Sequence, residues 1–248
     1  DSHSWLGRLN NIRTALQGQQ GDRRLRLGIA GGEWKKMMAD ATARTRFASE
    51  VKKIIEQYDF DGVDFDFEWP ANASEYNNYS ATVIQMRSTL GKYVYFTASL
   101  HPVSFKISPE AIDALDFISY QCYGPAVMRF PYEQFVKDGE AAVAYGIPKN
   151  KLVMGVPFYG STGSLIAAYC DFVNDGLATT NEDTYTYKGN TYTFNSIETI
   201  RKKARYVCEE DYAGIMSWDL ATDIDITNNK SLLKVIKEEF EYYANPTE

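Results

Sequence analysis

The sequence predicts an α/β fold in which βα units build a parallel sheet. Short apolar runs of strand length alternate along the chain with longer amphipathic segments, the order that βα units produce. The length of 248 residues suits one α/β barrel or two smaller domains. Because no repeat, low-complexity stretch or linker interrupts the pattern, we expect a single domain over residues 1–248.

The expected elements can be placed in order. A first helix is capped by Ser4 and has four apolar side chains on one face: Leu6, Leu9, Ile12 and Leu16. Six strands are expected at residues 25–30, 60–69, 93–100, 117–123, 152–158 and 213–220. Later helices are expected near residues 47–58, 75–90, 109–115, 132–145, 197–209 and 231–243. Between the last two strands, an insertion is expected at about 161–211, with a hairpin over 184–194 that turns at residues 188–190.

Composition excludes some classes of partner. The net charge of −7 argues against nucleic acid and anionic membranes, which attract basic surfaces. No apolar run of about 18 residues is present, so no membrane span is expected. Three widely spaced cysteines, Cys122, Cys170 and Cys208, fit no zinc pattern and are expected to be buried thiols, with one disulfide and one free thiol as the alternative. We expect no cofactor and no metal.

The strand at 60–69 carries the most informative pattern. Side chains alternate between the faces of a strand, so three carboxylates share one face: Asp64, Asp66 and Glu68. The other face is apolar: Val63, Phe65 and Phe67. An acidic stripe on a solvated edge strand fits poorly, because that second face is too apolar and Pro70 ends the run. A divalent-metal site is the other alternative, but no His or second acidic cluster completes it.

Pairing of the carboxylates gives a better explanation. Neighbouring carboxylates resist ionising together, so one of them is expected to stay protonated near neutral pH. A general acid that protonates a leaving glycosidic oxygen needs that property. Glu68 ends the strand, where the active sites of α/β barrels form. The excess of Tyr and Trp in the chain also suits a sugar-binding cleft.

The spacing Asp61-x-x-Asp64-x-Asp66-x-Glu68 resembles the DxxDxDxE signature on the fourth strand of glycoside hydrolase family 18, the chitinase family. Other segments resemble family motifs in order and spacing: residues 27–32 the third strand, 121–123 the sixth, 155–160 the seventh and 214–219 the eighth. The resemblance runs from about residue 24 to 240 and implies a TIM (β/α)8 barrel.

The resemblance implies hydrolysis of β-1,4 bonds in chitin or chitooligosaccharides by a retaining, substrate-assisted mechanism. The acetamido carbonyl of the substrate attacks the anomeric carbon, so no enzyme nucleophile is needed. Glu68 is then the general acid and base, Asp66 orients the acetamido N–H, and Asp64 supports Asp66. Tyr123 holds the acetamido oxygen.

The same resemblance suggests the substrate-binding residues. Trp218 is the platform under the sugar, and Gln121, Tyr159 and Trp69 are further candidates. A role in the core is the alternative for Tyr123, Trp218 and Tyr159. Gly124 and Ser161 stand where many family members carry Asp or Asn and Arg, so the subsite contacts are expected to differ.

The six expected strands correspond to the third to eighth of the family, and nothing before residue 24 supplies the first two. An open six-stranded sheet would expose two edges. We therefore expect an N-terminally incomplete domain, through truncation or disorder. A barrel completed by another segment and a half-open barrel are the alternatives. The short insertion favours an open groove and endo action.

Other functions remain possible. An endo-β-N-acetylglucosaminidase that acts on N-glycans would share the motif and the chemistry, because loops decide which glycan fits. A non-catalytic chitin-binding lectin is a further alternative, although intact Glu68 argues against it. A protein inhibitor or structural barrel without sugar contact is the last. A polymeric substrate, and more weakly three Asn-x-Ser sequons, predict a secreted, periplasmic or cell-surface protein. We expect a monomer.

Overall fold

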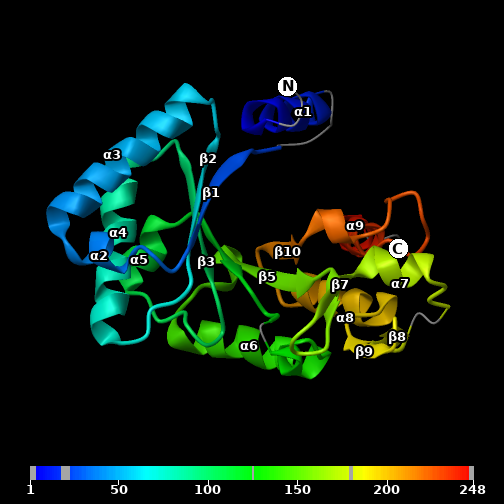
Figure 1. The fold of residues 1–248 in the computed structure, drawn as a ribbon. Coiled ribbons are helices and arrows are strands. Elements are labelled where there is room, and N and C mark those ends of the chain that lie inside the picture. Colours follow the sequence, from blue (N-terminus) through cyan, green and yellow to red (C-terminus); the bar gives the residue numbers. More distant parts are fainter. Residues whose placement is uncertain (1–3, 18–22, 125, 179–180, 246–248) are drawn as a thin grey trace. The chain divides into compact units, whose positions relative to one another are not determined.

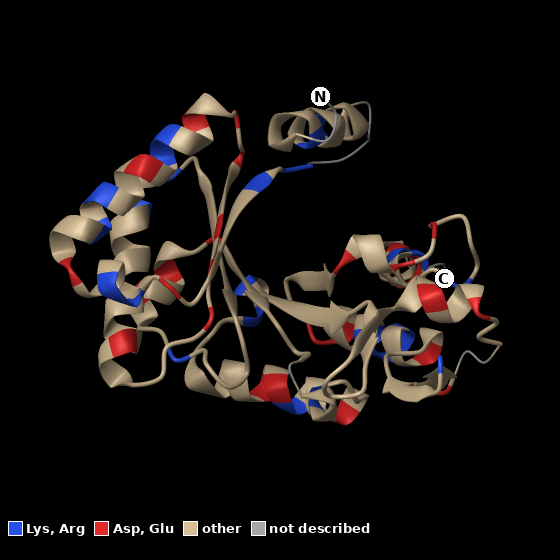
Figure 2. Cartoon of the chain, in the orientation of Figure 1, with Lys and Arg blue, Asp and Glu red and all other residues tan. Residues whose placement is uncertain are grey.

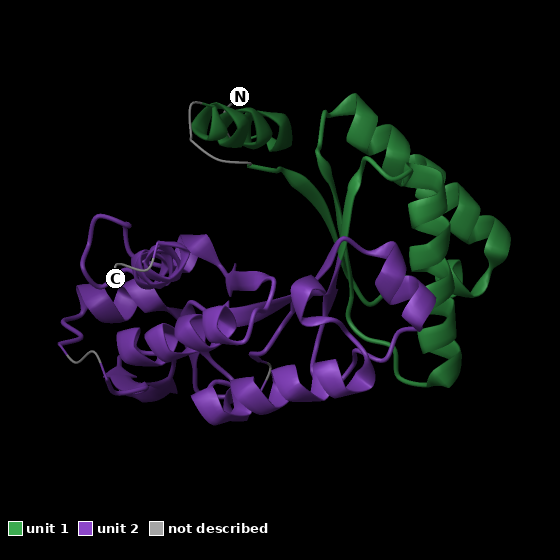
Figure 3. Ribbon diagram, turned by 180° about the vertical axis from the view of Figure 1, so that it is seen from behind, with its two compact units in different colours: residues 1–97 green, residues 98–248 purple. Residues whose placement is uncertain are grey.

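A computed structural model describes residues 4–17, 23–124, 126–178 and 181–245. The chain forms two compact units, residues 1–97 and 98–248 (Figure 3). The boundary falls within strand β3, on which the chain passes from the first unit to the second.

The parallel sheet contains the six predicted strands in the order β1-β2-β3-β4-β5-β10 (Figure 1). Their bounds are β1 Arg26–Gly31, β2 Gly62–Phe67, β3 Tyr95–Leu100, β4 Phe117–Tyr120, β5 Leu152–Pro157 and β10 Gly214–Trp218. In this order β1 and β10 are the end strands, so the described part of the chain does not close a barrel. Neither end strand has a buried residue, whereas five of the six residues in β5 are buried.

The helices lie close to their predicted places. Their bounds are α1 Trp5–Leu16, α2 Lys35–Ala39, α3 Ala41–Gln57, α4 Ala73–Leu90, α5 Pro109–Ala114, α6 Tyr132–Tyr145, α7 Tyr169–Asn174, α8 Ile197–Glu209 and α9 Leu232–Ala244. Ser4 caps α1 as expected, since its side chain accepts a hydrogen bond from the Gly7 N–H. The apolar face of α1 is largely exposed, and of its four predicted residues only Leu9 is buried. The short helices α2 and α7 were not predicted.

In the first unit, α3 and α4 cover one side of β1 and β2 (Figure 1). The Phe65 ring contacts the rings of Phe47 in α3 and Tyr79 in α4, at centroid distances of 5.6 and 5.4 Å. Gly62 is required where β2 meets β3, because a Cβ atom there would lie 1.9 Å from the Tyr95 carbonyl oxygen. On the outer surface of α3, acidic and basic residues alternate (Figure 2), and pairs such as Lys53 and Glu50 are within 2.8 Å.

The second unit contains the insertion, which forms a four-stranded antiparallel sheet in the order β7-β6-β9-β8. The bounds are β6 Tyr159–Ser161, β7 Ile166–Ala168, β8 Thr184–Tyr187 and β9 Asn190–Thr193. The predicted hairpin is β8–β9, and its turn has positive φ at Lys188 and Gly189, as a tight two-residue turn requires. The aromatic core of this sheet surrounds Phe172: Tyr185, Tyr187, Tyr192 and Phe194.

The described residues include the three cysteines and can be searched for membrane-spanning helices and metal sites. Cys122 is a buried free thiol, and Cys170 and Cys208 are free and partly buried. Of the helices described, none has the length and apolarity to cross a membrane. Within the same residues, no three His, Cys, Asp or Glu side chains are grouped as a metal site would need.

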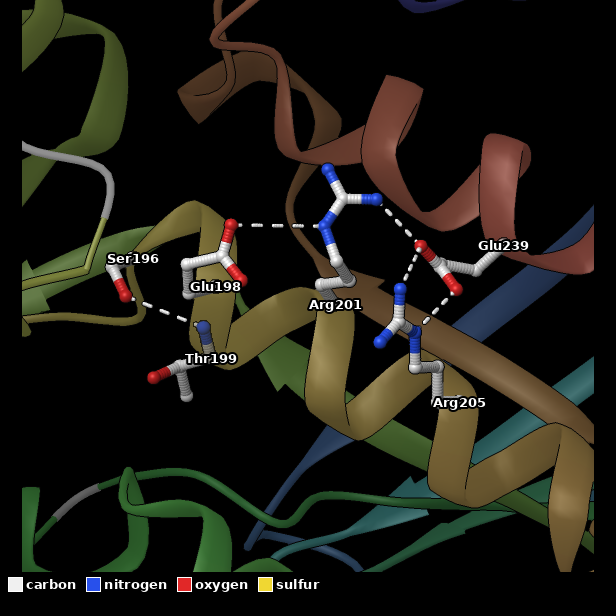
Figure 4. Close-up of polar contacts among 6 residues, drawn as sticks. All are labelled: Ser196, Glu198, Thr199, Arg201, Arg205 and Glu239. Carbon is white, nitrogen blue, oxygen red and sulfur yellow. Dashed lines mark hydrogen bonds and ion pairs between the residues drawn. The ribbon is translucent and has the colours of Figure 1, made fainter.

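Helices α8 and α9 are joined by a buried carboxylate (Figure 4). Glu239 of α9 is 5% exposed and accepts hydrogen bonds from two arginines of α8, at 2.5 Å from Arg201 and 2.8 Å from Arg205. Arg201 also approaches Glu198 at 3.8 Å. Burial by itself raises the pKa of Glu239, but the bonds from Arg205 and Arg201 outweigh it, so the pKa is lowered overall.

We expect Glu239→Gln to lower the free energy of unfolding by about 1–3 kcal/mol at pH 7, because charged hydrogen bonds are lost. A carboxyl whose pKa falls on folding stabilises the protein above its ordinary pKa of 4.5, and that contribution disappears as the pH falls through the lower folded value. The difference between the variant and the wild type should therefore shrink below about pH 4. Urea unfolding at several pH values measures it, with exposed Glu238→Gln on the same helix as the control. A pH-independent difference would contradict the expectation.

Candidate active site

Strand β2 has the two faces that the sequence predicted. Val63, Phe65 and Phe67 are at most 1% exposed, and Asp64 and Asp66 on the other face are half-buried. Glu68 follows the last residue of β2 and is exposed. The apolar face is buried against helices, so the carboxylates are on the face that is open to a ligand.

The neighbouring strand leaves room over the two aspartates. In the parallel register of β1 and β2, Gly28 lies beside Asp64 and Ala30 lies beside Asp66. Because paired residues in a sheet project to the same face, the smallest side chains flank the carboxylates.

Asp64 is held by groups from both neighbouring strands. Its Oδ1 accepts a hydrogen bond from the Thr97 hydroxyl of β3 and lies 3.5 Å from the Arg26 guanidinium of β1. Arg26 also donates to the Thr97 hydroxyl. These contacts fix the Asp64 carboxylate from both sides of its strand.

The charges of Asp64 and Asp66 also act on Tyr79, which lies on the other side of β2. Tyr79 of α4 is fully buried, and its hydroxyl donates to the Phe65 carbonyl oxygen at 2.9 Å. Burial raises the pKa of Tyr79 well above its usual value, and the charges of Asp64 and Asp66 raise it further. Tyr79 is therefore a neutral hydrogen-bond donor behind the carboxylates.

The backbone around Glu68 is fixed by the end of β1. The Glu68 N–H donates to the Gly31 carbonyl oxygen at 3.2 Å, and a Cβ atom on Gly32 would lie 2.9 Å from the Glu68 carbonyl oxygen. The Glu68–Trp69 peptide bond is cis, and the Trp69 side chain is half-buried. Gly32 thus permits the close approach of the Glu68 backbone, and Gly31 has a positive φ of 115°, which favours glycine.

In the second unit, Tyr123 and Tyr159 belong to one buried cluster. They are 7% and 9% exposed, and their rings meet edge to face at 6.4 Å. Phe130 contacts Tyr159 at 5.6 Å, and Met216 of β10 packs against the group. The Tyr123 hydroxyl donates to the Met216 sulfur at 3.4 Å. The structure therefore brings these two predicted tyrosines together.

The remaining two candidates of this unit differ in exposure. Gln121 is buried, and its N–H donates to the Leu100 carbonyl oxygen at 2.8 Å. Trp218 ends β10 and is 58% exposed, which contradicts the core alternative for this residue. Its carbonyl oxygen accepts a hydrogen bond from the Phe158 N–H at 2.8 Å, and its peptide bond to Asp219 is cis. A largely exposed indole held through its backbone is suited to stacking on a ligand.

A family model decides the classification. The model described as "Glycosyl hydrolases family 18" matches residues 5–223. The chain belongs to glycosyl hydrolases family 18. The family prediction drawn from the β2 motif is thus confirmed, and the protein is a glycoside hydrolase by family.

Individual relatives of this family 18 member are distant in sequence. Probable chitinase 2 of Drosophila melanogaster is 23% identical over an alignment 297 residues long, gaps included. The alignment covers 88% of this chain and 60% of the fly protein. The solved structure of a chitinase from Bacteroides thetaiotaomicron is 23% identical with a TM-score of 0.80, covering 96% of this chain and 82% of that one. A chitinase-like agglutinin from Robinia pseudoacacia is 18% identical with a TM-score of 0.77, covering 94% and 85%. The structural likeness confirms the predicted α/β, TIM-type fold.

Sequence reasoning missed a residue that holds the Tyr123 segment of this family 18 chain. His101 is 2% exposed, and its Nε2 lies 3.0 Å from the Tyr123 carbonyl oxygen and 2.6 Å from that of Gly124. Its Nδ1 accepts from the Val103 N–H at 3.2 Å, so Nε2 carries the proton that is donated to the carbonyls. A buried lone His gives no such signal in the sequence, because both contacts join distant segments.

The backbone at Gly124 leaves little room for a side chain. Its φ is +26°, and a Cβ atom there would lie 2.8 Å from the Tyr159 hydroxyl. A side chain at position 124 would therefore require the Tyr159 hydroxyl to shift.

We expect Gly124→Ala to displace the Tyr159 hydroxyl and to lower kcat/KM about tenfold on a chitooligosaccharide, because misplaced binding groups weaken catalysis. Gly146→Ala is the matched control, since Gly146 also has a positive φ but no atom near its Cβ position. Both variants should lose about 1 kcal/mol of stability from backbone strain. Equal kcat/KM values for the two variants would contradict a role for Tyr159.

Proposed function

We propose that the protein hydrolyses β-1,4 bonds next to N-acetylglucosamine in chitin or chitooligosaccharides, with retention at the anomeric carbon. The column of Asp64, Asp66 and Glu68 on and after β2 is the observation on which this proposal depends. Family membership supports it, and so do relatives that are named chitinases. The polymeric substrate leads us to propose a secreted or cell-surface protein.

In the proposed mechanism Glu68 transfers the protons. It protonates the leaving glycosidic oxygen while the acetamido carbonyl oxygen of the substrate bonds to the anomeric carbon and the glycosidic bond breaks. An oxazolinium ion results. Glu68, now a carboxylate, takes a proton from water, whose oxygen attacks the anomeric carbon and reopens the ring. The exposure of Glu68 at the end of β2 suits a group that meets both a sugar and water.

Asp66 and Asp64 support the substrate's own nucleophile. Asp66 accepts a hydrogen bond from the acetamido N–H and stabilises the positive charge of the oxazolinium ion, because opposite charges attract strongly at a half-buried site. Asp64 is fixed by Arg26 and Thr97 and orients Asp66. Small Gly28 and Ala30 leave the space that the sugar would occupy.

The aromatic residues bind the sugar. Tyr123 donates to the acetamido oxygen, and Trp218 stacks on the apolar face of the ring, for which its exposed indole is suited. Tyr159, Gln121 and Trp69 complete the proposed set of substrate contacts. None of these steps needs a metal or a cofactor.

The test compares substrates. The protein is incubated with chitotetraose or chitohexaose, and separately with a high-mannose glycopeptide, and products are identified by mass spectrometry. We expect products from the chitooligosaccharides. Product from the glycopeptide alone would replace the chitinase proposal with an endo-β-N-acetylglucosaminidase. Binding measured by calorimetry without any product would instead indicate a lectin.

A further inference from the structure

A lysine is buried in the second unit where an apolar residue would be expected. Lys203 lies on α8, is fully buried, and is surrounded on its own helix face by Ile200, Ala204 and Val207. Lysine is almost never fully buried unless its ammonium group is paired, because desolvation is costly. Its partners should therefore explain why the residue is there.

The three N–H groups of Lys203 have three acceptors. Nζ donates to the Phe130 carbonyl oxygen at 2.7 Å and to Asn195 Oδ1 at 2.7 Å. The ring of Phe135 lies below it, with its centroid 4.8 Å from Nζ. Two oxygens and an aromatic face satisfy the ammonium group, and no carboxylate among the described residues forms an ion pair with it.

Two of these groups converge on one backbone atom. Besides Lys203, the side-chain N–H of Asn195 donates to the Phe130 carbonyl oxygen at 2.9 Å. Asn195 is 1% exposed, so this pair of donors is shielded from water. We call Lys203 and Asn195 the Phe130 clamp. The preceding residue is fixed too, by an ion pair between Arg129 and Asp138 at 2.8 Å.

The clamped residue touches the candidate site. The Phe130 ring meets Tyr159 edge to face at 5.6 Å, and Tyr159 meets Tyr123. Phe130 is 1% exposed and cannot turn without displacing these rings. A shift of its backbone would therefore be passed to both tyrosines.

We propose that Lys203 and Asn195 are positioning residues for the sugar-binding tyrosines: by fixing the Phe130 carbonyl, they fix the Phe130 ring and, through it, Tyr159 and Tyr123. The proposal rests on the proposed function of these tyrosines. Helix α8 would thus help to shape the site from behind, without contact of its own with substrate.

The hydrogen bonds, rather than the charge of Lys203, are the means of this positioning. Burial lowers the pKa of Lys203 to about 7, and the nearby acidic groups Cys122, Asp183, Asp138 and Glu133 oppose that fall. Ammonium and amine forms therefore coexist near neutral pH. Both forms have N–H groups that can donate to the Phe130 carbonyl oxygen.

The first experiment measures hydrolysis of chitotetraose by Lys203→Met, which keeps the length of the side chain but removes its donors. Lys202→Met, at the exposed neighbour on α8, is the matched control. At a temperature well below the melting point of each variant, we expect kcat/KM to fall about tenfold for Lys203→Met, mainly through KM, and to change less than twofold for the control. Unchanged kcat/KM for Lys203→Met would overturn the proposal.

A double-mutant cycle separates positioning from general stability. If Lys203 acts through the Phe130 ring, Lys203→Met should add little to the loss in kcat/KM already caused by Phe130→Leu. A structural role without this path would make the two losses multiply, and that outcome would overturn the proposal. If Lys203→Met does not fold, Asn195→Asp removes one donor to the same carbonyl while keeping an acceptor for Lys203. We expect about a threefold loss from it.

A second readout does not depend on turnover. In protein labelled with ¹³C in the tyrosine rings, the resonances of Tyr159 and Tyr123 are assigned by Tyr→Phe variants. Lys203→Met should shift both, and Lys202→Met should shift neither. Unshifted rings overturn the positioning role even if the wild type is active. Shifted rings in a protein that hydrolyses nothing would support the role while refuting the proposed function.

Discussion

Glu68→Gln is expected to lower kcat on chitotetraose by about 10²- to 10⁴-fold, the usual contribution of general acid–base catalysis. The amide has nearly the same shape as the acid but cannot supply a proton to the leaving oxygen. Because the Glu68 side chain is exposed and follows the end of β2, the free energy of unfolding should change by less than about 0.5 kcal/mol. Substrate binding should therefore survive the loss of turnover.

The measurement uses two substrates. Chitotetraose has a poor leaving group, whereas a 4-methylumbelliferyl chitobioside releases a phenolate that needs little protonation. The variant should lose much less activity with the second substrate, because only the acid step has been removed. Glu56→Gln, an exposed substitution on α3, is the control. Full activity of Glu68→Gln on chitotetraose would rule out the proposed acid.

The chemistry-bearing strand could be predicted because its pattern is local. A period of two separates Asp64 and Asp66 from Phe65 and Phe67, and burial in the structure follows that period residue by residue. Helix α8 also lies where it was expected, at 197–209, and the Ser196 side chain caps its first turn. Patterns of this kind need no knowledge of the rest of the fold.

Strand ends were harder to place. The apolar run suggested a strand over 117–123, but β4 ends at Tyr120, and the Cys122 N–H turns back to the Tyr120 carbonyl oxygen at 2.9 Å. Strands β6 and β7 were not predicted, because three residues each are too few to show alternation. Their pairing is a tertiary feature of the insertion.

The residues that hold the candidate site residues in place could not be predicted from the sequence, for a different reason. Arg26 and Thr97 reach Asp64 from other strands, His101 reaches carbonyl groups more than 20 residues away, and Lys203 reaches Phe130 across 73 residues. Each is defined by contacts between distant segments rather than by spacing. The sequence thus supports a proposal for the residues that touch substrate, while the structure adds the residues that hold them.

Asp66→Asn is the second large effect that we expect. Asparagine has the shape of aspartate but no charge, and Asp66 is half-buried on the face of β2 that Gly28 and Ala30 leave open. Loss of the charge that stabilises the oxazolinium ion should lower kcat by about 10²- to 10³-fold, as removal of a preorganised electrostatic group does. Folding should be preserved, and far-UV circular dichroism with thermal melting checks this.

The leaving group separates the role of Asp66 from that of Glu68. The oxazolinium charge develops whichever group departs, so Asp66→Asn should lose as much activity on the 4-methylumbelliferyl substrate as on chitotetraose. Glu68→Gln should instead recover on the activated substrate. Asp113→Asn, at an exposed position, controls for the loss of one negative charge. If Asp66→Asn kept the wild-type kinetics, or recovered with the better leaving group as Glu68→Gln should, its assigned interaction with the acetamido group would be wrong.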